Sequence, residues 1–495
     1  MNSWMKWKNS KLLFFIILGL IFLAHLPFIG ADPDRNMAVG RGPFTDEGLN
    51  TSQVRNWVNQ GELNLSECDN LLKTPLLGFP LALTYKIFGV SHQVSRLHVL
   101  VLVFLCLFII GIDDKNRLLM LIFSLIALLQ YPIFQSSHFS KAEMLSVAAI
   151  LLSIHFFSRS FDEIGNSKSG IRQIIIAGAF LSLSYFIKIQ FIYIVPLIPI
   201  VLIIRWYTTN YHLRKMIVRQ GIIIITSLIV FLVLYILAWY LPNKKAYDYM
   251  MAHQSGEFTL SGKTWEYIGF NIGYHFLKGS VQWFVYIFFF LMVAGILLLK
   301  RTKSMRYPVL FISSLVWFIL ESHKLMMVYL PTRYQVSLIA SMGLLMSVVL
   351  AELFTNPAEK LKLYARSLAV MMLLIMTAIN GYNYIDTLNN RTYAIRDANE
   401  YLARSLNKDD VILGAWAPSL TWASGSKTLP VWNHFLNYQD PIANFHPRAV
   451  IAETDEQDSE QAWSSQGIDL RALSDSTRTV KIGKWDLRIF WIKEY

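Results

Sequence analysis

Eleven long apolar stretches constrain this chain of 495 residues more than any other feature. A helix needs roughly 20 mainly apolar residues to cross a bilayer, and a soluble protein could not tolerate so many such runs on its surface. The sequence therefore predicts an α-helical polytopic membrane protein with about eleven transmembrane helices. The runs lie near 12–30, 95–112, 118–134, 142–158, 173–187, 189–205, 220–241, 281–299, 307–321, 331–351 and 367–381.

Three apolar regions of the sequence, one of them outside the eleven runs, need interpretation. Residues 173–205 are too long for one crossing and are interrupted by Lys188 and two prolines, so we predict two helices joined by a tight turn. The stretch 76–89 is short and carries Lys86, which predicts an interfacial or re-entrant segment. The first run, 12–30, resembles a signal peptide but lacks a clean small-x-small cleavage pattern, so we expect it to be retained as the first span.

The net charge of +12 comes from Lys and Arg residues gathered in short clusters between the apolar runs. This distribution is typical of membrane proteins and argues against nucleic acid as a partner. Because basic loops stay on the cytoplasmic side, we predict an N-in, C-out topology, and we expect a bacterial cytoplasmic membrane. The clusters are Lys6, Lys8 and Lys11; Lys115 and Arg117; Arg159, Lys168 and Arg172; Arg205, Arg214, Lys215 and Arg219; Lys300, Arg301, Lys303 and Arg306; and Lys360, Lys362 and Arg366.

Three segments then fall on the exterior side: a first loop over 31–92 with interfacial helices, a loop over 242–280, and the tail. The tail differs sharply in composition from the rest, so we expect a transmembrane domain over 1–381 and a small α/β domain over 382–495. Its expected elements are an amphipathic helix over 391–406 and strands over 411–416, 448–452, 479–482 and 487–492.

A set of ionisable residues collects in the exterior loops and at the exterior ends of the spans. Charges at a membrane edge are costly and usually face a cavity or a partner, although any one of them can instead snorkel to the interface or end a helix. Because all fall on one side of the predicted topology, we favour a shared site. The set is Asp46, Glu47, Lys73, Arg96, His138, Lys141, Glu143, Lys188, Glu321, His323, Lys324 and Arg333.

Some of these residues also have purely structural interpretations. Acidic residues are common in the first turn of a helix, so Asp46 fits an interfacial helix over Glu47–Trp57 capped at Thr45. Lys73 likewise fits a helix start, since a proline follows two residues later. Lys188 has a weaker structural explanation, because a bare ammonium between two apolar halves needs an interface or an anionic partner.

Three N-terminal motifs stand out: Phe44-Thr45-Asp46-Glu47, Lys73-Thr74-Pro75-Leu76-Leu77-Gly78, and Phe88-Gly89 through Ser95-Arg96-Leu97. They resemble those of GT-C polyprenyl-phosphate-sugar glycosyltransferases, and within that fold the protein O-mannosyltransferase and lipid A aminoarabinose transferase branch. Weaker matches are Ser140-Lys141-Ala142-Glu143, Lys188 and Arg333-Tyr334. The chain departs from the family pattern at Thr74, where proline is common, and at Gly48, where a bulkier residue often stands.

The resemblance implies a catalytic base at Asp46, a donor-phosphate contact at Lys73 and a second acidic residue at Glu143. A polyprenyl phosphate is a good leaving group, so the reaction needs cations to absorb the developing charge and one carboxylate to take the acceptor proton. Glu47 or Glu143 would orient the base or hold a divalent ion, and direct displacement would invert the anomeric centre. The expected donor-phosphate residues are Lys73, Arg96, Lys188, Arg333 and Tyr334, with Lys141, His138, His323 and Lys324 in support.

The function predicted is transfer of a sugar from a polyprenyl-phosphate donor to a lipid, glycan or protein acceptor on the exterior face. Two alternatives remain: a lipid-linked glycan flippase, although no half-to-half similarity is found, and an O-antigen ligase or polymerase, which would carry its large functional loop later in the chain. Cys68 and Cys106 support neither a disulfide framework nor a zinc site. The sequence does not identify the sugar or the acceptor.

Overall fold

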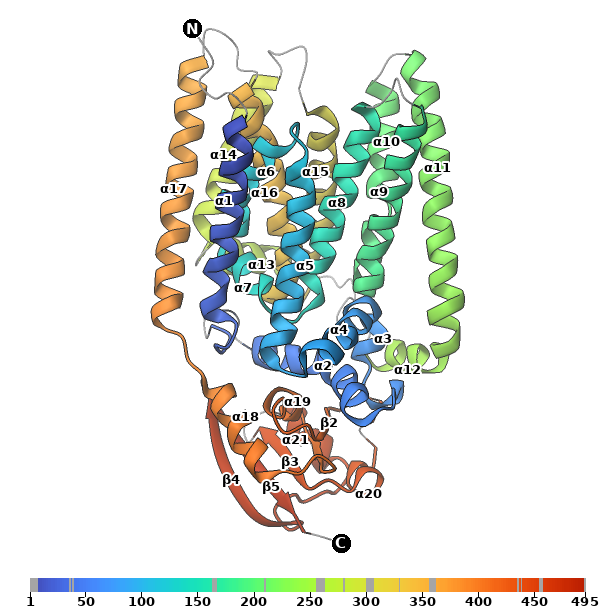
Figure 1. Ribbon diagram of the computed structural model, residues 1–495, viewed down its shortest axis with the longest axis vertical. Helices are drawn as coiled ribbons and strands as arrows, with labels where there is room; N and C mark the ends of the chain where they lie inside the picture. Colours follow the sequence, from blue (N-terminus) through green and yellow to red (C-terminus); the bar gives the residue numbers. More distant parts are fainter. Residues whose placement is uncertain are drawn as a thin grey trace.

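The computed structural model consists of a long helical bundle with a small sheet-containing domain at one end (Figure 1). The bundle and the end domain have the architecture that the apolar runs and the tail predicted: a polytopic α-helical membrane protein with a C-terminal α/β domain. The structure describes residues 8–493 except 35–36, 38–39, 163–166, 209–210, 255–262, 279–280, 300–306, 329, 356–361, 434–435, 438 and 454–456.

All eleven apolar runs are helical. Nine helices of the described residues are long and apolar enough to span a membrane, and one bent pair makes up to ten. The run predicted at 281–299 is α14, of which 282–293 count as a shorter apolar helix. The long helices are α1 (Lys8–His25), α5 (His92–Ile112), α8 (Ala142–Asp162), α9 (Ser167–Ile187), α10 (Leu197–Thr208), α11 (Tyr211–Tyr235), α14 (Gln282–Leu299), α15 (Pro308–Glu321), α16 (Thr332–Thr355) and α17 (Lys362–Asn389).

Two runs are broken where the sequence carries polar or proline residues. The run predicted at 118–134 forms α6 (Arg117–Phe123), a π-turn (η3, Ser124–Leu128) and α7 (Tyr131–Ser137), and the pair is bent by 96°. Proline at the second position of α7 lacks a backbone N–H and is tolerated only in the first turn of a helix. The predicted split at Lys188 is confirmed, because α9 ends at Ile187 and the 3₁₀ segment η4 (Ile189–Ile194) follows.

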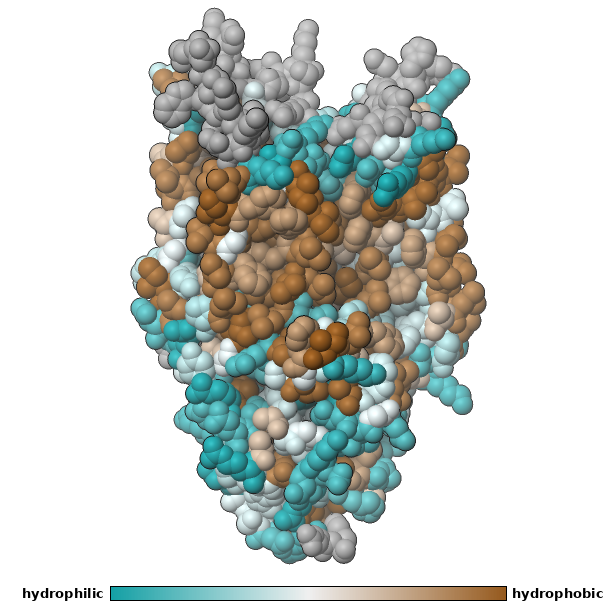
Figure 2. Space-filling view, viewed as in Figure 1, coloured by the Kyte–Doolittle hydropathy of each residue, from teal (hydrophilic) through white to brown (hydrophobic). Residues whose placement is uncertain are grey.

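The bundle has two distinct ends. The start of α1, the end of α10 and the start of α11 lie at one end, whereas α2, α3, α4, α12 and the C-terminal domain lie at the other, here called the domain end (Figure 1). On the face shown in Figure 2, a brown apolar band crosses the bundle between teal polar regions, as expected of helices in lipid. Several basic residues used to predict the topology, Lys6, Lys300, Arg301, Lys303, Arg306 and Lys360, lie outside the described residues.

Helix α16 forms the centre of the bundle. The most apolar stretch of α16 is entirely buried, whereas only a small share of the corresponding stretches of α11 and α17 is buried. Small residues let neighbours approach it closely: at Gly343 an added Cβ would lie 2.5 Å from the Ala127 methyl group. This central helix begins at Thr332, at the domain end of the bundle.

Short helices cover the domain end of the bundle. The helix α2 begins at Gly42, three residues before the expected cap, so Thr45 lies inside the helix and the N-cap is Arg41. Pro43 in the first turn accounts for the earlier start. The stretch 76–89 forms the short helix α4, as predicted. The remaining short elements are η1 (Leu26–Phe28), α2 (Gly42–Gln60), η2 (Leu65–Glu67), α3 (Asn70–Lys73), α4 (Pro75–Phe88), η5 (Ile236–Tyr240), η6 (Leu241–Asn243), α12 (Lys244–Gln254), α13 (Thr264–Asn271), η8 (Ile272–Phe276) and η10 (Ser322–Met326).

The C-terminal domain is a five-stranded mixed sheet in the order β2-β1-β3-β5-β4. The first three strands in this order are parallel, and β5 pairs antiparallel with both β3 and β4. The sheet separates two apolar clusters, which take alternate residues of the buried strand β3. The elements are α18 (Ala394–Ser405), β1 (Val411–Leu413), α19 (Ala417–Leu420), β2 (Lys427–Leu429), α20 (Pro441–Phe445), β3 (Ala449–Glu453), α21 (Gln457–Ser464), β4 (Ser474–Ile482) and β5 (Trp485–Ile492).

Candidate functional site

Asp46 stands in the first turns of α2 and faces two cations from other helices. Its Oδ2 accepts a hydrogen bond from Arg333 NH1 at 2.7 Å, at the start of α16, and lies 3.3 Å from Lys141 Nζ, just before α8. The Lys141 ammonium also donates to the carbonyl of Gly42 at 3.4 Å, at the beginning of α2. The start of α2 is therefore tied to the domain ends of both α8 and α16.

A second carboxylate, Glu143, lies close to the first. Lys188 Nζ donates to Glu143 Oε1 at 2.6 Å, and Arg333 Nε lies 3.9 Å from the same oxygen. The other oxygen, Oε2, is buried and has no hydrogen-bond partner among the described residues. The Tyr334 ring lies beside both cations, with its centre 5.0 Å from Lys188 Nζ and 5.1 Å from Arg333 Cζ. Arg333 thus bridges the two carboxylates.

We call Asp46, Lys141, Glu143, Lys188 and Arg333 the rim cluster. Three cations face two carboxylates, which leaves one positive charge in excess. Arg333 and Asp46 keep 27% and 15% of their side chains exposed, so an incoming ligand can reach both. An excess cation in a mostly buried polar cluster is suited to bind an anion such as phosphate.

The neighbour of Asp46 makes entirely different contacts. Glu47 forms a bidentate ion pair with Arg96 of α5, with Nε to Oε1 at 2.9 Å and NH2 to Oε2 at 2.5 Å. His92 Nε2 lies 3.2 Å from Oε2, and the backbone N–H of Ser140 donates to Oε1 at 2.7 Å. Burial alone would raise the pKa of Glu47, but the charge of Arg96 and the contact with His92 hold that pKa well below its ordinary value.

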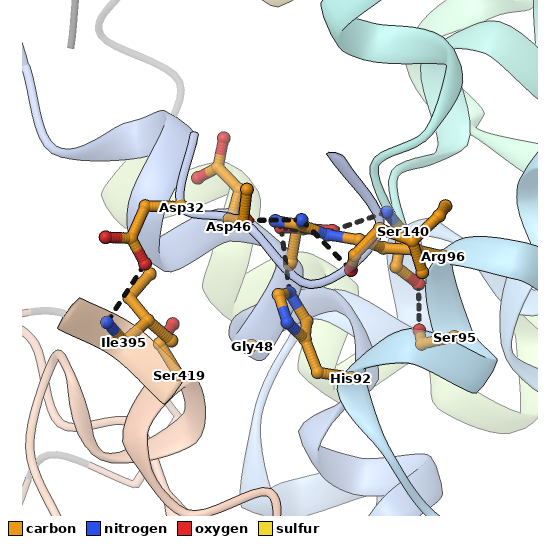
Figure 3. A network of polar contacts seen from close by, with 12 residues as sticks. Asp32, Asp46, Gly48, His92, Ser95, Arg96, Ser140, Ile395 and Ser419 are labelled. Carbon is orange, nitrogen blue, oxygen red and sulfur yellow. Dashed lines mark hydrogen bonds and ion pairs between the residues drawn. The ribbon is translucent and has the colours of Figure 1, made fainter. Parts of the chain in front are cut away.

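Arg96 has no side chain surface left for a ligand. It is fully buried, and NH1 donates to the carbonyls of Phe28 at 2.9 Å and Ala31 at 2.6 Å. Figure 3 shows this network around Arg96 and the Asp46 carboxylate pointing away from it. Successive helical residues point about 100° apart, so adjacent carboxylates at the start of α2 serve two separate sets of partners.

Lys73 lies at the end of α3 rather than in the rim cluster. Its Nζ lies 2.9 Å from Asp69 Oδ2, one turn earlier on the same helix. The preceding residue is held through its backbone, because the carbonyl of Leu72 accepts hydrogen bonds from Trp239 at 3.0 Å and Tyr247 at 2.5 Å. The segment that carries Lys73 is therefore anchored to η5, which follows α11, and to α12.

The supporting residues predicted from the sequence lie in two other places. His138, after α7, has its Nδ1 3.0 Å from His25 Nδ1 and stacks on Phe28. Lys324 pairs with Glu321 at 2.6 Å and donates to the Tyr334 carbonyl at 3.3 Å, next to the rim cluster.

Glu321 is the centre of that second group of polar side chains. Besides the ammonium of Lys324, it accepts hydrogen bonds from Tyr193 at 2.7 Å, Trp317 at 3.0 Å and Ser337 at 2.6 Å. His323 instead has Nδ1 2.6 Å from the Leu320 carbonyl and packs edge-on against Tyr193. Glu321 is thus held by four partners, one of which, Lys324, also binds the Tyr334 carbonyl.

The C-terminal domain packs directly on the helix that carries Asp46. Phe44 joins one apolar cluster of that domain, with its ring 4.8 Å from Trp485. A Cβ added at Gly48 would lie 2.5 Å from Ser419 Oγ, so only glycine fits where α2 and α19 touch. Arg55 donates to the Pro418 carbonyl at 2.6 Å. The unusual glycine of the N-terminal motif is thus explained by a domain contact.

Metal binding was left open by the sequence. Within the described part of the chain, no three His, Cys, Asp or Glu side chains come together as ligands. Glu47 and Glu143, the residues expected to hold a divalent ion, are instead neutralised by Arg96 and Lys188. These two carboxylates are therefore bound by cations of the protein itself.

Two groups in contact with the candidate site were missed in the sequence. The Ser140 backbone N–H and the His92 side chain both bind Glu47, yet His92 was given no role, although it lies inside the matched segment 88–97. Ser140 stands in the matched segment before α8, and its hydroxyl also contacts Ser95, so that segment offered a signal. A backbone donor in a loop leaves no such pattern of side chains.

Comparisons with known proteins place this arrangement in a fold. No family model and no curated protein match the sequence. Among solved structures, ArnT from Cupriavidus metallidurans matches in the apo state with a TM-score of 0.61 and 13% identity, over 97% of both chains. The same protein bound to undecaprenyl phosphate matches with a TM-score of 0.58, also at 13% identity and over 97% of both chains.

A second protein matches less completely. The archaeal oligosaccharyltransferase AglB from Archaeoglobus fulgidus, in complex with an inhibitory peptide and a dolichol-phosphate, gives a TM-score of 0.53 at 11% identity. The match covers 91% of this chain and 70% of AglB. At such low identities the likeness concerns the fold, and it confirms the GT-C fold predicted from the N-terminal motifs.

Proposed function

We propose that this protein is an inverting glycosyltransferase that moves a sugar from a polyprenyl-phosphate donor to an acceptor hydroxyl or amine. The reaction would take place at the domain end of the bundle, on the exterior face of a bacterial cytoplasmic membrane. The observation that carries the proposal is the rim cluster, in which Asp46 and three cations from separate helices meet beside the apolar band. The fold shared with ArnT bound to undecaprenyl phosphate supports a lipid-phosphate donor.

The cations of the rim cluster would hold the donor phosphate. As the bond from the anomeric carbon to the phosphate oxygen breaks, negative charge develops on the departing polyprenyl phosphate. Arg333 presents a planar fork of donors that suits phosphate oxygens, and Lys188 stands 2.6 Å from Glu143, close enough to act on the same group. Tyr334 packs against both and limits their movement.

Asp46 would act as the general base. The acceptor oxygen or nitrogen bonds to the anomeric carbon and loses its proton, which Asp46 accepts. Glu143 keeps one oxygen without a protein partner, and we assign it to orient the sugar or the base. Because the acceptor attacks opposite the departing phosphate, the product has inverted configuration at the anomeric carbon.

In the expected phosphate set, Arg96 receives a different role and Lys73 keeps its role. The Arg96 guanidinium donates to Glu47 and to backbone carbonyls, so we assign the Glu47–Arg96 pair to position α2 rather than to bind the donor. Lys73 stays a proposed phosphate contact on the strength of the motif resemblance. Lys324 would support Tyr334, His323 would support Tyr193, and His138 would support the end of α1.

The proposal is tested with purified protein in nanodiscs and a panel of polyprenyl-phosphate sugars, scored for release of the lipid phosphate. Loss of a general base typically lowers rates by about 10²–10⁴-fold, so Asp46→Asn should lower release by at least about 100-fold. Asp248→Asn is the matched control, because Asp248 is a half-exposed aspartate on α12 at the same end, and its partner is the half-exposed Lys244 one turn earlier. Full activity of Asp46→Asn, or release of lipid phosphate from no donor in the panel, would reject the proposal.

A further inference from the structure

A cavity of about 410 Å³ lies between the bundle and the C-terminal domain, apart from the rim cluster. Its walls come from the segment after α1, the start of α2, α7, the α17–α18 connection and the β4–β5 turn. Figure 1 shows this connection descending beside the lower end of α1 to reach the C-terminal domain. A volume of this size lies within the range of small-molecule sites.

Aromatic rings form the apolar part of the cavity wall. They are Phe28, Phe44 and Trp485, contributed by three different segments. Phe44 and Trp485 lie 4.8 Å apart at 59°, so they present a fixed corner rather than two mobile rings. Large rigid aromatic faces bind ligands with apolar patches at a low entropic cost, and sugar rings carry such patches on the faces formed by their C–H groups.

A buried polar group in the wall lacks a partner. Gln135 of α7 lines the cavity and is only 2% exposed, and its Nε2 has no hydrogen-bond partner among the described residues. Buried amide donors are nearly always satisfied in folded proteins. A ligand oxygen in the cavity would supply the missing acceptor.

The charged side chains of the wall balance one another, with Asp32 and Asp34 on one side and Arg391 and Lys484 on the other. Asp32 caps α18, accepting hydrogen bonds from the backbone N–H groups of Ala394 at 2.7 Å and Ile395 at 3.0 Å. Arg391 donates to the carbonyls of Leu388 at 2.8 Å and Pro27 at 2.9 Å. Because two acidic and two basic side chains leave the wall without net charge, the cavity favours an uncharged ligand with hydroxyl or amide groups.

We propose that this cavity binds an uncharged sugar unit of the acceptor glycan, an assignment that rests on the proposed function. Phe44 and Asp46 are two residues apart on α2, so their side chains point about 200° apart around the helix. The unit held in the cavity is therefore distinct from the attacked unit, and the acceptor is at least a disaccharide. In this site a hydroxyl group of the ligand would bind the Gln135 amide, and one face of a sugar ring would pack on Trp485.

The test measures sugar binding without any donor, using the full chain in nanodiscs. Chitotriose, maltotriose and mannotriose are the neutral probes, inorganic phosphate is the anionic probe and a neutral tripeptide is the peptide probe. Saturation-transfer NMR and calorimetry should detect at least one trisaccharide and neither of the other probes. Gln135→Leu and Trp485→Ala should weaken its binding at least tenfold, while Gln173→Leu on α9, outside the cavity wall, should leave it unchanged.

The unfolding temperature distinguishes a role of Gln135 in sugar binding from a purely structural role. Removing an unpartnered buried donor leaves nothing unsatisfied, so Gln135→Leu should keep or raise that temperature while losing the sugar. No trisaccharide binding, binding of phosphate or peptide only, or binding unchanged in both cavity variants would overturn the proposal. Because the binding test contains no donor, a negative result would reject the sugar site without affecting the release of lipid phosphate. The two proposals can therefore be rejected independently.

Discussion

The guanidinium of Arg333 lies 2.7 Å from the Asp46 carboxylate, although 287 positions separate the two residues. It also approaches Glu143, which starts α8, at 3.9 Å. Ionised groups at the edge of an apolar bundle are costly unless they meet a partner or a water-filled space, and here they meet each other. The ends of three helices are thereby drawn to one point at the border of the membrane.

The Glu47–Arg96 pair is predicted to stabilise the protein rather than react. Glu47→Gln leaves the fully buried Arg96 without its counter-ion, which should lower the free energy of unfolding by about 3–5 kcal/mol. Chemical unfolding in detergent measures the loss. The double variant Glu47→Gln/Arg96→Met removes both charges and should recover part of it, together with activity. Loss of activity with unchanged stability would instead make Glu47 a reacting group.

The same pair predicts a pH dependence. The pKa of Glu47 is held well below its ordinary value by Arg96 and His92 despite burial, so its carboxylate is favoured by folding. Its contribution to stability is fully present above the unfolded pKa of about 4.3 and is lost as the pH falls below it. Unfolding temperatures followed from neutral to acidic pH should drop more steeply for the wild type than for Glu47→Gln. Parallel curves would contradict the ion pair.

The contact between α2 and the C-terminal domain is predicted to be intolerant of a single methyl group. Gly48→Ala places a Cβ 2.6 Å from backbone atoms of the α19 segment, and overpacking of this kind costs about 1–3 kcal/mol. Gly269→Ala is the matched control, because that helical glycine has nothing within 4 Å and alanine is the better helix former. Gly48→Ala should lower both the unfolding temperature and the transfer rate. Equal behaviour of the two variants would exclude close packing at this joint.

Lys73 is predicted to contact the donor and Lys86 is not. Lys73→Ala should raise the apparent KM for the donor by about tenfold, the size expected from losing one charged hydrogen bond of about 1.5–3 kcal/mol. Lys86→Ala is the control, since that lysine on α4 lies over the Trp57 ring, 5.2 Å from its centre. Steady-state kinetics with a varied donor concentration compare the two. An unchanged KM for Lys73→Ala would remove that residue from the donor site.

Much of this architecture could be predicted from the sequence because membrane spans leave a strong signal. Apolar runs located every long helix, and Lys188 located the break after α9. The partners of adjacent residues could not be predicted in this way. Asp46 and Glu47 look alike in the sequence, yet Glu47 is the one that pairs with Arg96. The sequence had instead predicted that Arg96 binds phosphate. The strand β2 has three residues and no pattern of its own, so it was missed.

Details of the domain joint were also out of reach. Gly48 departs from the motif for a reason that lies 371 positions further along the chain, at Ser419. The last span was expected to end near 381, but α17 continues to Asn389, because nothing in its sequence breaks the helix. Contacts between distant segments depend on packing, which local patterns do not encode.

The most direct measurement is an experimental structure of the protein with a bound polyprenyl phosphate. The account predicts that the phosphate lies within hydrogen-bond distance of Arg333 and Lys188, with the Asp46 carboxylate within about one sugar ring of it. A phosphate bound elsewhere, with the Asp46–Arg333 pair intact and remote from it, would contradict the account.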